Sequence, residues 1–506
     1  MIWRAEATEP VPARCEPGPD LPAGNEERAL GTFDLTVVGG GAAGLWSALC
    51  AAEEGGSVCL VSRKPLAESS SFHAQGGLAA ALDPADSPEL HFEDTMAAGR
   101  NLCRASAVRV LTEEGPGIVD DLVRRGMNFD REPDGSLGLA LEGGHSQRRI
   151  IHSGGSQTGR EITSALAQMV ADMDRIQVLE ETSALALIAD DRRCYGVITD
   201  AGVVASPATL MATGGAAALW RRTSNPWGAI GAGPVLASAA GAELADLEFC
   251  QFHPTCLSAP GTAFDGALIT EAIRGEGATL LDLDGKRFTE ELAPRDDVTT
   301  AILAQARDQG GRAVRLDLTS IDPAKFPSVF ALLKAAGFDG TREPVPVSPG
   351  AHYMMGGIAV DLDGRTTVEG LYAAGECACT GLHGANRLAS NSLTECFVFG
   401  RRAALAGLRE EAKPMPAPSG WRFDPPQPAT RESVWEHAGP LRDAAGLTHL
   451  ADDPYPLARA IGATALSREE SRGGHRRTDF RDADPQLDFT HLVYRPDGEI
   501  ELRRWD

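Results

Sequence analysis

The segment FDLTVVGGGAAGLWSALCAAEEGGSVCLVSR, residues 33–63, constrains the fold more than any other part of the chain. An apolar run precedes Gly39, Gly41 and Gly44 in G-x-G-x-x-G order, and an Ala-rich segment with helical periodicity leads to a second apolar run at 58–61. This order predicts a strand, a tight turn, a helix and a strand. The first glycine permits the turn, the second lets backbone approach a pyrophosphate, and the third lets the helix pack on the strand. We therefore predict a Rossmann-like, dinucleotide-binding α/β fold.

The type of dinucleotide is not settled by this fingerprint. The second strand usually ends near an acidic residue that binds ribose hydroxyls, but this chain has Ser62-Arg63-Lys64 there. The next loop, SSSFHAQGGLAA at 69–80, has a glycine pair beside hydroxyl side chains, which suits backbone close to a flat ring or a phosphate. An ordinary Ser/Gly loop is the alternative interpretation.

Composition excludes several classes of function. The 506 residues carry a formal charge of −24, which argues against nucleic acid or an anionic membrane surface as a partner. The ten cysteines form no C-x-x-C pair, so no iron–sulfur cluster or other metal site is indicated, and we expect reduced cysteines in a cytoplasmic protein. No apolar stretch is long enough to span a bilayer. Residues 1–30, rich in Pro and Glu, predict a disordered tail.

Shifts in composition predict how the chain is divided into domains. Short β-rich runs from 176 to 213 predict a hairpin layer that returns to the main sheet. A shift near residue 241 introduces short helices and loops, and strands return at 356–376. We therefore expect a nucleotide-binding domain interrupted by an inserted domain. The expected ranges are 31–240 and 355–410 for the nucleotide-binding domain, 241–354 for the insertion and 411–506 for a C-terminal region.

Histidines and arginines in Gly/Pro-rich loops form the candidate substrate site. His253, Arg295, His352 and Arg387 all lie in such loops. Each taken singly is more often structural. Together, beside a dinucleotide site, they would form a cationic pocket for a small dicarboxylate, because Arg binds carboxylate through two hydrogen bonds and His adds others.

These motifs, over roughly residues 31–410, resemble the flavoprotein family of succinate dehydrogenase, fumarate reductase and L-aspartate oxidase. Within the family, Leu141-Glu142-Gly143-Gly144-His145-Ser146 is similar to the acidic loop of the L-aspartate oxidases, in which the Glu recognises the substrate's α-ammonium. The resemblance implies a Rossmann-like FAD-binding domain interrupted by an α+β capping domain.

The implied activity is oxidation of L-aspartate to iminoaspartate, the first step towards quinolinate and NAD. Oxygen, giving hydrogen peroxide, or fumarate, giving succinate, would accept the electrons, and a quinolinate synthase would consume the imine. One alternative is a soluble fumarate reductase or succinate dehydrogenase flavoprotein subunit. A flavin-binding assembly or sensor protein without turnover is another.

The resemblance also implies residue roles. His253, Thr270, His352 and Arg387 would hold the carboxylates. Arg295 would transfer a proton, Glu271 and Arg274 would relay protons, and Glu142 would face the ammonium. The residues expected to line FAD are Gly39, Gly40, Gly41, Ala42, Ala43, Gly44, Arg63, Ser70, Ser71, Phe72, His73, Ala74, Gln75, Gly76, Gly77, Glu376, Ser392 and Leu393.

Three departures from the family pattern carry expectations of their own. Membrane-bound relatives link FAD covalently through a His five residues before the Gln of A-Q-G-G; Ser70 occupies that position here, so FAD should be non-covalent. The usual Gly-Asp-Gly reads Gly231-Ala232-Gly233, so FAD should bind more weakly. Only 27 residues separate Arg442 from Glu470, which predicts a shortened C-terminal helical region.

Overall fold

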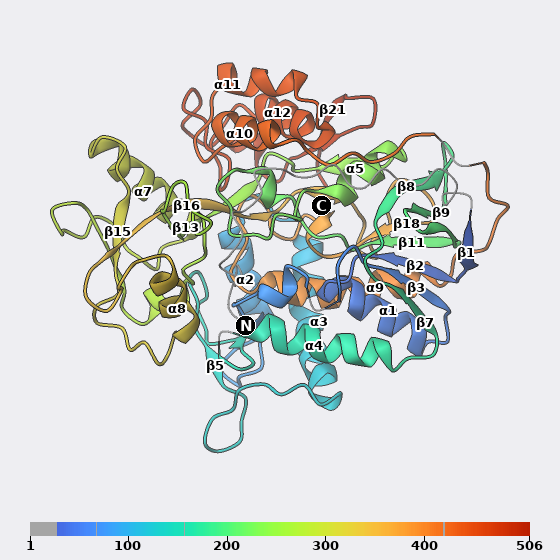
Figure 1. Cartoon of the computed structure of the whole chain (residues 1–506), viewed down its shortest axis with the longest axis horizontal. Coiled ribbons are helices and arrows are strands. Elements are labelled where there is room, and N and C mark those ends of the chain that lie inside the picture. Colours follow the sequence, from blue (N-terminus) through green and yellow to red (C-terminus); the bar gives the residue numbers. More distant parts are fainter. Residues whose placement is uncertain (1–27, 67, 156, 418–419) are drawn as a thin grey trace.

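The computed structural model describes residues 28–66, 68–155, 157–417 and 420–506. Figure 1 shows the main sheet on the right, with helices α1, α4 and α9 below it and a smaller sheet above it. A separate sheet with helices α7 and α8 lies on the left, and the C-terminal helices, in red, lie across the top. This α/β arrangement agrees with the predicted fold class.

The main sheet has five parallel strands in the order β18-β11-β2-β3-β7. Its central strands β2 and β3 come from the glycine fingerprint, and every residue in both is buried. Strands covered on both faces carry continuous apolar runs, which is why the sequence identifies this pair so clearly. The strands are β2 (Leu35–Val38), β3 (Val58–Val61), β7 (Ile176–Leu179), β11 (Ala208–Met211) and β18 (Leu371–Ala373).

Helix α1 (Ala42–Glu53) packs on the main sheet beside α9, and 11 of its 12 residues are buried. Alanine and glycine fill much of α1, so its neighbours can approach closely. Trp46 meets Phe397 of α9 edge-on, with ring centroids 5.5 Å apart. The other helices of this part are α2 (Pro88–Ala98), α3 (Ala105–Arg124), α4 (Thr158–Ala171), α5 (Ala232–Ala239) and α9 (Asn391–Gly407).

The smaller sheet on the opposite face has the order β1-β10-β9-β8. Two predictions differ from the structure here. The predicted tail extends to residue 30, but β1 begins at Ala29 because it pairs with β10, and residues 1–27 lie outside the described residues. The predicted hairpin layer includes β7, which instead pairs with β3. The remaining strands are β1 (Ala29–Thr32), β4 (Leu78–Ala79), β5 (Leu139–Ala140), β6 (Ile150–Ile151), β8 (Ala184–Ala189), β9 (Cys194–Thr199) and β10 (Gly202–Ala205).

The capping segment, residues 241–354, contains an antiparallel sheet in the order β13-β16-β15-β14. Its apolar side chains, among them Leu280, Val314 and Val345, form a core of their own. The elements are β12 (Leu244–Ala245), β13 (Cys250–Leu257), α6 (Ala272–Gly275), β14 (Thr279–Leu281), α7 (Arg295–Asp308), β15 (Val314–Asp317), α8 (Pro327–Ala335) and β16 (Val345–Met354).

The described residues of the C-terminal segment, 411–506, form helices and two strands. Strand β20 pairs with β12, in a sheet of order β19-β17-β12-β20-β21, so the end of the chain completes a sheet begun in the capping segment. The sequence analysis predicted the helices and missed the strands. The elements are β17 (Gly357–Ala359), β19 (Ala378–Cys379), α10 (Pro428–His437), α11 (Ala444–Thr448), α12 (Pro456–Ser467), β20 (His491–Tyr494) and β21 (Ile500–Arg503). In the part of the chain that the structure describes, no helix combines the length and apolarity needed to cross a bilayer.

Candidate active site

The glycine fingerprint forms the N-terminal end of α1. A Cβ on Gly39, whose φ is +126°, would lie 2.1 Å from the carbonyl oxygen of Ala212, and a Cβ on Gly44 would lie 1.8 Å from that of Gly39. Backbone packing therefore requires glycine at both positions. At Gly41 a Cβ would meet nothing closer than Ser71 Oγ, at 3.3 Å. This leaves room beside the first turn of α1, and a helix N-terminus with such room suits a pyrophosphate.

The loop predicted to line the flavin lies between two helix N-termini. The Ala42 amide, in α1, donates to Ser71 Oγ at 3.2 Å. The Gly77 amide donates to Ser390 Oγ, also at 3.2 Å, directly before α9. Ser70 lies directly before the first contact, Phe72, His73, Ala74, Gln75 and Gly76 lie between the two, and Ser392 and Leu393 lie in the first turn of α9.

Two buried polar atoms test whether this region fits a cofactor. Gln75 Oε1 and Thr213 Oγ1 are buried and have no hydrogen-bond partner among the described residues. Buried polar atoms in folded proteins nearly always have a partner. Both atoms would gain one from a polar ligand, so the residues present fit a dinucleotide cofactor.

The remaining predicted cofactor residues are Glu376 and Arg63. Glu376 follows β18, and its Oε1 accepts a hydrogen bond from the Met354 amide at 3.0 Å. Burial raises the pKa of Glu376 to about 7, against the opposing effects of that amide and of Arg387. Arg63 donates to the Gly228 carbonyl at 2.9 Å, and burial lowers the pKa of Arg63.

Gln251 joins the two arginines of the predicted substrate site. Arg295, the first residue of α7, donates from Nη1 to Gln251 Oε1 at 2.9 Å. Arg387, in the loop before α9, reaches the same oxygen from Nη2 at 3.3 Å, and its Nη1 donates to Ser392 Oγ at 2.7 Å. A single neutral oxygen therefore accepts from both guanidinium groups. The sequence analysis did not name Gln251 as a site residue, although it lies two residues before His253 on β13 and so faces the same side.

His253 and His352 lie on the paired strands β13 and β16, with ring centroids 5.2 Å apart. Burial and the positive charge of Arg295 hold the pKa of both imidazoles well below the ordinary value, so both rings are neutral. His253 Nδ1 accepts from the Thr255 amide at 3.3 Å, which places the ring proton on Nε2. His352 Nδ1 lies 2.7 Å from Ser224 Oγ. Neutral histidines of this kind can donate hydrogen bonds to a carboxylate.

Glu271 connects Arg295 to Arg274. Arg295 Nε donates to Glu271 Oε2 at 2.6 Å, and Arg274 Nη2 lies 3.5 Å from the same oxygen. Burial alone would raise the pKa of Glu271, but the two guanidinium groups outweigh it and lower the pKa. Burial lowers the pKa of Arg274. Thr270, directly before Glu271, is also buried.

Glu142 lies at the edge of this cluster. Its Oε2 accepts from Ser390 Oγ at 2.6 Å, and its Oε1 lies 3.8 Å from His152 Nε2. The loop that carries Glu142 packs against Glu271, since a Cβ on Gly143 would lie 2.3 Å from Glu271 Oε1. Glu142 thus places a negative charge beside Arg387.

The charges of the cluster remain net positive. Burial, followed by repulsion from Arg295, lowers the pKa of Arg387 to about 10, which still leaves it charged at neutral pH. The Arg387 guanidinium lies 4.7 Å from the ring centroid of Tyr353, a cation–π distance. Two neutral histidines and arginines that outnumber their acids make a site for an anion with more than one carboxylate.

The chain is similar, in sequence and in fold, to proteins of known function. The FAD binding domain family matches residues 34–393, and the C-terminal family of fumarate reductase flavoproteins matches residues 451–504. An L-aspartate oxidase of Caulobacter vibrioides is 45% identical over 90% of this chain and 95% of its own length. One of Streptomyces coelicolor is 39% identical over 94% of this chain and 93% of its own. Among solved structures, E. coli quinol fumarate reductase superposes with a TM-score of 0.84 at 29% identity, covering 94% of this chain and 96% of that one.

Proposed function

The chain belongs to the L-aspartate oxidases of the succinate dehydrogenase and fumarate reductase flavoprotein family, and we propose that the cluster around Gln251 is its active site. The activity is FAD-dependent oxidation of L-aspartate to iminoaspartate, with oxygen or fumarate as the electron acceptor, in NAD biosynthesis. The observation that carries the site assignment is Glu142, a carboxylate whose negative charge acts on the buried Arg387.

We propose a division into an FAD-binding domain of residues 31–240 and 355–410, a capping domain of 241–354 and a C-terminal region of 411–506. When bound, FAD supplies the acceptor for the hydride that leaves Cα of aspartate. The first turn of α1 would hold its pyrophosphate, Glu376 a sugar hydroxyl, and residues 70–77 with Ser392 and Leu393 its flavin end.

FAD is held without a covalent bond in this proposal, because Ser70 occupies the position at which membrane-bound relatives carry the linking His. Acid precipitation should release all flavin into the supernatant. Flavin absorbance that stays with the precipitated polypeptide would contradict it.

The carboxylates of aspartate are bound by Arg387, His253, His352 and Thr270. Arg387 is oriented by Ser392, Gln251 and Tyr353, so little conformational freedom remains to be lost on binding. The neutral imidazole of His253 presents its Nε2 proton as a donor. Burial of these groups keeps water from competing for the carboxylates.

Arg295 is the proton-transfer residue. In aspartate oxidation it would take a proton from Cβ as the hydride leaves Cα, and the enamine so formed would tautomerise to iminoaspartate. In fumarate reduction the reverse transfer would give a proton to the carbon next to the one that receives the hydride. Glu271, 2.6 Å away, and Arg274, beyond it at 3.5 Å, form a chain of contacts through which that proton is replaced. The two arginines on Glu271 keep it ionised and able to accept a proton.

Glu142 distinguishes aspartate from succinate. The two molecules share a four-carbon chain with two carboxylates, and they differ by the ammonium on Cα. A carboxylate attracts an ammonium and gains nothing comparable from a methylene. The acidic loop therefore supplies the preference for an amino acid.

Reduction of bound flavin under anaerobic conditions tests this function. Aspartate should bleach the flavin absorbance rapidly, and succinate at the same concentration should do so far more slowly. Bleaching by succinate alone would favour a succinate dehydrogenase or fumarate reductase. A flavin that neither compound bleaches would point to a binding protein without turnover.

The product sets a requirement on the next enzyme. Iminoaspartate hydrolyses in water, so we propose functional coupling to a quinolinate synthase that consumes it. We also propose that the protein works in the cytoplasm, where the nine described cysteines, all free, would stay reduced.

A further inference from the structure

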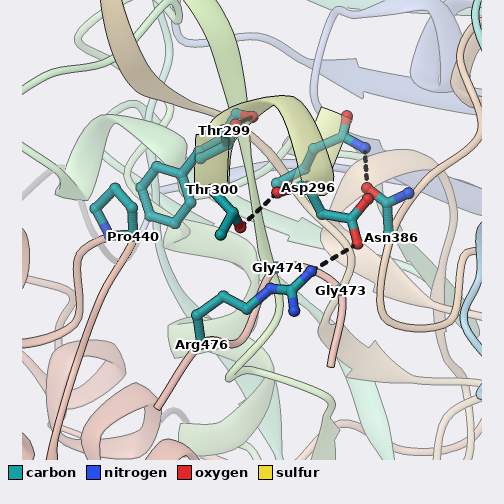
Figure 2. Close-up of a pocket in the computed structure, with 10 residues that line it drawn as sticks. Asp296, Thr299, Thr300, Asn386, Pro440, Gly473, Gly474 and Arg476 are labelled. Atoms are coloured by element: carbon teal, nitrogen blue, oxygen red, sulfur yellow. Dashed lines mark hydrogen bonds and ion pairs between the residues drawn. The ribbon is translucent and has the colours of Figure 1, made fainter. Parts of the chain in front are cut away.

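Two arginines from distant parts of the chain bind the first turn of α7. Asp296 directly follows Arg295, and its side chain is only 2% exposed. Arg100 donates to both carboxylate oxygens of Asp296, each at 3.0 Å. Arg476, from the C-terminal segment, donates to Asp296 Oδ2 at 3.1 Å; in Figure 2 this contact is the dashed line that rises from Arg476 to Asp296. Asp296 is therefore a buried carboxylate neutralised from outside the capping segment.

The C-terminal segment also holds Arg100 in place. Arg100 and Asn101 have φ of +58° and +57°, a conformation that L residues keep only when their surroundings hold it. Arg472 donates to the Arg100 carbonyl at 2.6 Å, and the Phe489 amide donates to the Asn101 carbonyl at 2.7 Å. Residues 472–489 therefore supply Arg476 and also hold the backbone that carries Arg100, so both ion pairs of Asp296 depend on this segment.

The first turn of α7 borders a small pocket. Figure 2 shows residues that line it, between α7 and the loop that holds Arg476, and its volume of about 10 Å³ leaves room for about one water molecule. The pocket is lined by Gln251, Asp296, Asn386 and Arg476, together with Phe252, Thr299, Thr300, Pro440, Gly473 and Gly474. The ion pair between Asp296 and Arg476 closes one side of it. Without Arg476, the buried carboxylate of Asp296 would lose part of its compensating charge, which favours a shift of the first turn of α7 towards water.

A shift of that turn would move the proposed proton-transfer residue. Arg295 shares a peptide bond with Asp296, and its guanidinium makes contacts of 2.6 Å with Glu271 and 2.9 Å with Gln251. Contacts this short are lost by a small rotation of the helix start. The carboxylate clamp at Arg387 is held by Ser392, and its loop by the Gly474 amide, which donates to the Ala385 carbonyl at 2.8 Å. Neither contact uses the Arg476 side chain, so the clamp would stay in place.

We propose that Arg476 and Arg100, acting through Asp296, are positioning residues for Arg295. The C-terminal segment thereby sets the geometry of proton transfer, although it contributes no residue to the substrate site. This inference rests on the proposed role of Arg295. A purely structural ion pair would stabilise the fold and leave the turnover of correctly folded protein unchanged.

Replacing Arg476 tests the proposal in the full-length, FAD-loaded protein. Arg476→Gln should lower kcat per bound FAD by roughly 10- to 100-fold for both aspartate oxidation and fumarate reduction, the loss that a displacement of order 1 Å produces. The KM for aspartate should change by less than about threefold, because the carboxylate clamp is intact. Arg476→Lys should recover most of the loss, since one donated contact to Asp296 is enough.

A matched control comes from the same segment. Arg481 is exposed, and among the described residues its side chain donates only to the Thr478 carbonyl, at 3.3 Å. Arg481→Gln should leave both activities unchanged. If Arg476→Gln matches this control in kcat per bound FAD, even with a lower melting temperature, the proposal is overturned.

A double-mutant cycle keeps the test open if Arg476→Gln binds FAD poorly. Asp296→Asn preserves shape and removes the charge, so it should lower kcat, and adding Arg476→Gln should cost little more. If the two substitutions lower kcat by independent factors that multiply in the double variant, or if every variant loses FAD, the inference is overturned.

Arg295→Leu distinguishes failure of the proposed function from failure of the positioning role. Normal turnover in Arg295→Leu would reject the proposed role of Arg295. An inactive Arg295→Leu together with a normal Arg476→Gln would reject only the positioning role.

Discussion

At the scale of single residues, Gln251 makes the close approach of two positive charges tolerable. Its Oε1 accepts from Arg295 and Arg387, while its Nε2 donates to Asn386 Oδ1 at 2.9 Å and to the Arg387 carbonyl at 2.8 Å. These bonds fix which end of the amide faces the arginines. The substrate then meets two guanidinium groups that are already oriented, so less ordering is needed in the transition state.

Glu142→Gln should reduce kcat/KM for aspartate by about 10- to 150-fold, because a charge-assisted hydrogen bond to the ammonium contributes about 1.5–3 kcal/mol. Fumarate reduction should be unchanged or faster, since fumarate has no ammonium. Both rates are measured on one preparation and normalised to bound FAD. Glu132→Gln, an exposed acid in the preceding loop, serves as control. Equal loss of both activities would mean that Glu142 only stabilises its loop.

Arg295→Leu and Arg387→Leu should differ in kind. Arg295→Leu removes proton transfer, so kcat should fall by several orders of magnitude in both reactions with FAD still bound. Arg387→Leu removes binding shared by the ground state and the transition state, so KM should rise more than kcat falls. Steady-state kinetics on the two variants separates these effects. Near-normal turnover in Arg295→Leu would reject the assignment.

The ionisable residues of the site were within reach of the sequence, and the amide and hydroxyl residues were not. His253, His352, Arg295 and Arg387 could be grouped because His and Arg gathered near Gly/Pro-rich segments suggest an anion site. Of these four, only Arg387 lies in a loop, since both histidines lie on strands and Arg295 begins α7. Gln251 has no such signal except its period-two spacing from His253. Ser390 has φ of +61° and binds Glu142, and neither property can be read from its position in the loop.

At the scale of elements, the fingerprint helix α1 shows what the glycines contribute. Gly44→Ala should abolish FAD binding, because its Cβ would lie 1.8 Å from the Gly39 carbonyl oxygen and α1 would have to leave the sheet. Gly117→Ala is the matched control: it lies in α3 with nothing within 4 Å, and it should be neutral or stabilising by up to about 1 kcal/mol. Flavin content and melting temperature are measured for both variants and for the native protein. A yellow, stable Gly44→Ala protein would contradict the packing argument.

Elements with a local signal were predictable, and those defined by a distant partner were not. Strands β2 and β3 match the predicted runs residue for residue, since burial on both faces imposes an unbroken apolar sequence. Strand β1, by contrast, exists because the distant strand β10 lies beside it, whereas β20 pairs with its neighbour β21 and with the distant β12. Strands β2 and β3 are no longer than these, but they flank the glycine fingerprint, and neither β1 nor β20 stands beside a motif of that kind.

At the scale of the whole molecule, Glu376 links stability to pH in the FAD-free protein. Burial raises its pKa from 4.5 to about 7, so the folded protein holds a proton there that the unfolded chain releases at lower pH. The stability from this group is complete below about pH 4.5 and is lost as the pH rises through 7. Glu376→Gln should remove that loss, which amounts to at most about 3 kcal/mol.

Urea denaturation of FAD-free native protein and Glu376→Gln at several pH values between 5 and 8 measures the difference. As the pH rises, the free energy of unfolding of Glu376→Gln should increase relative to that of the native protein. The free energy of unfolding of Glu132→Gln should change with pH as that of the native protein does. Parallel curves for Glu376→Gln would show that Glu376 ionises normally in the fold.

The pairing of β20 with β12 has a consequence for synthesis on the ribosome. β12 ends at Ala245 and its partner β20 begins at His491, so one edge of β12 stays unpaired while about 250 further residues are made. At about 5–20 residues per second this takes roughly 12–50 seconds. An open strand edge invites pairing with other chains. Because β12 has only two residues, the edge that stays open during this interval is short, and the sheet can be completed late without exposing a long strand.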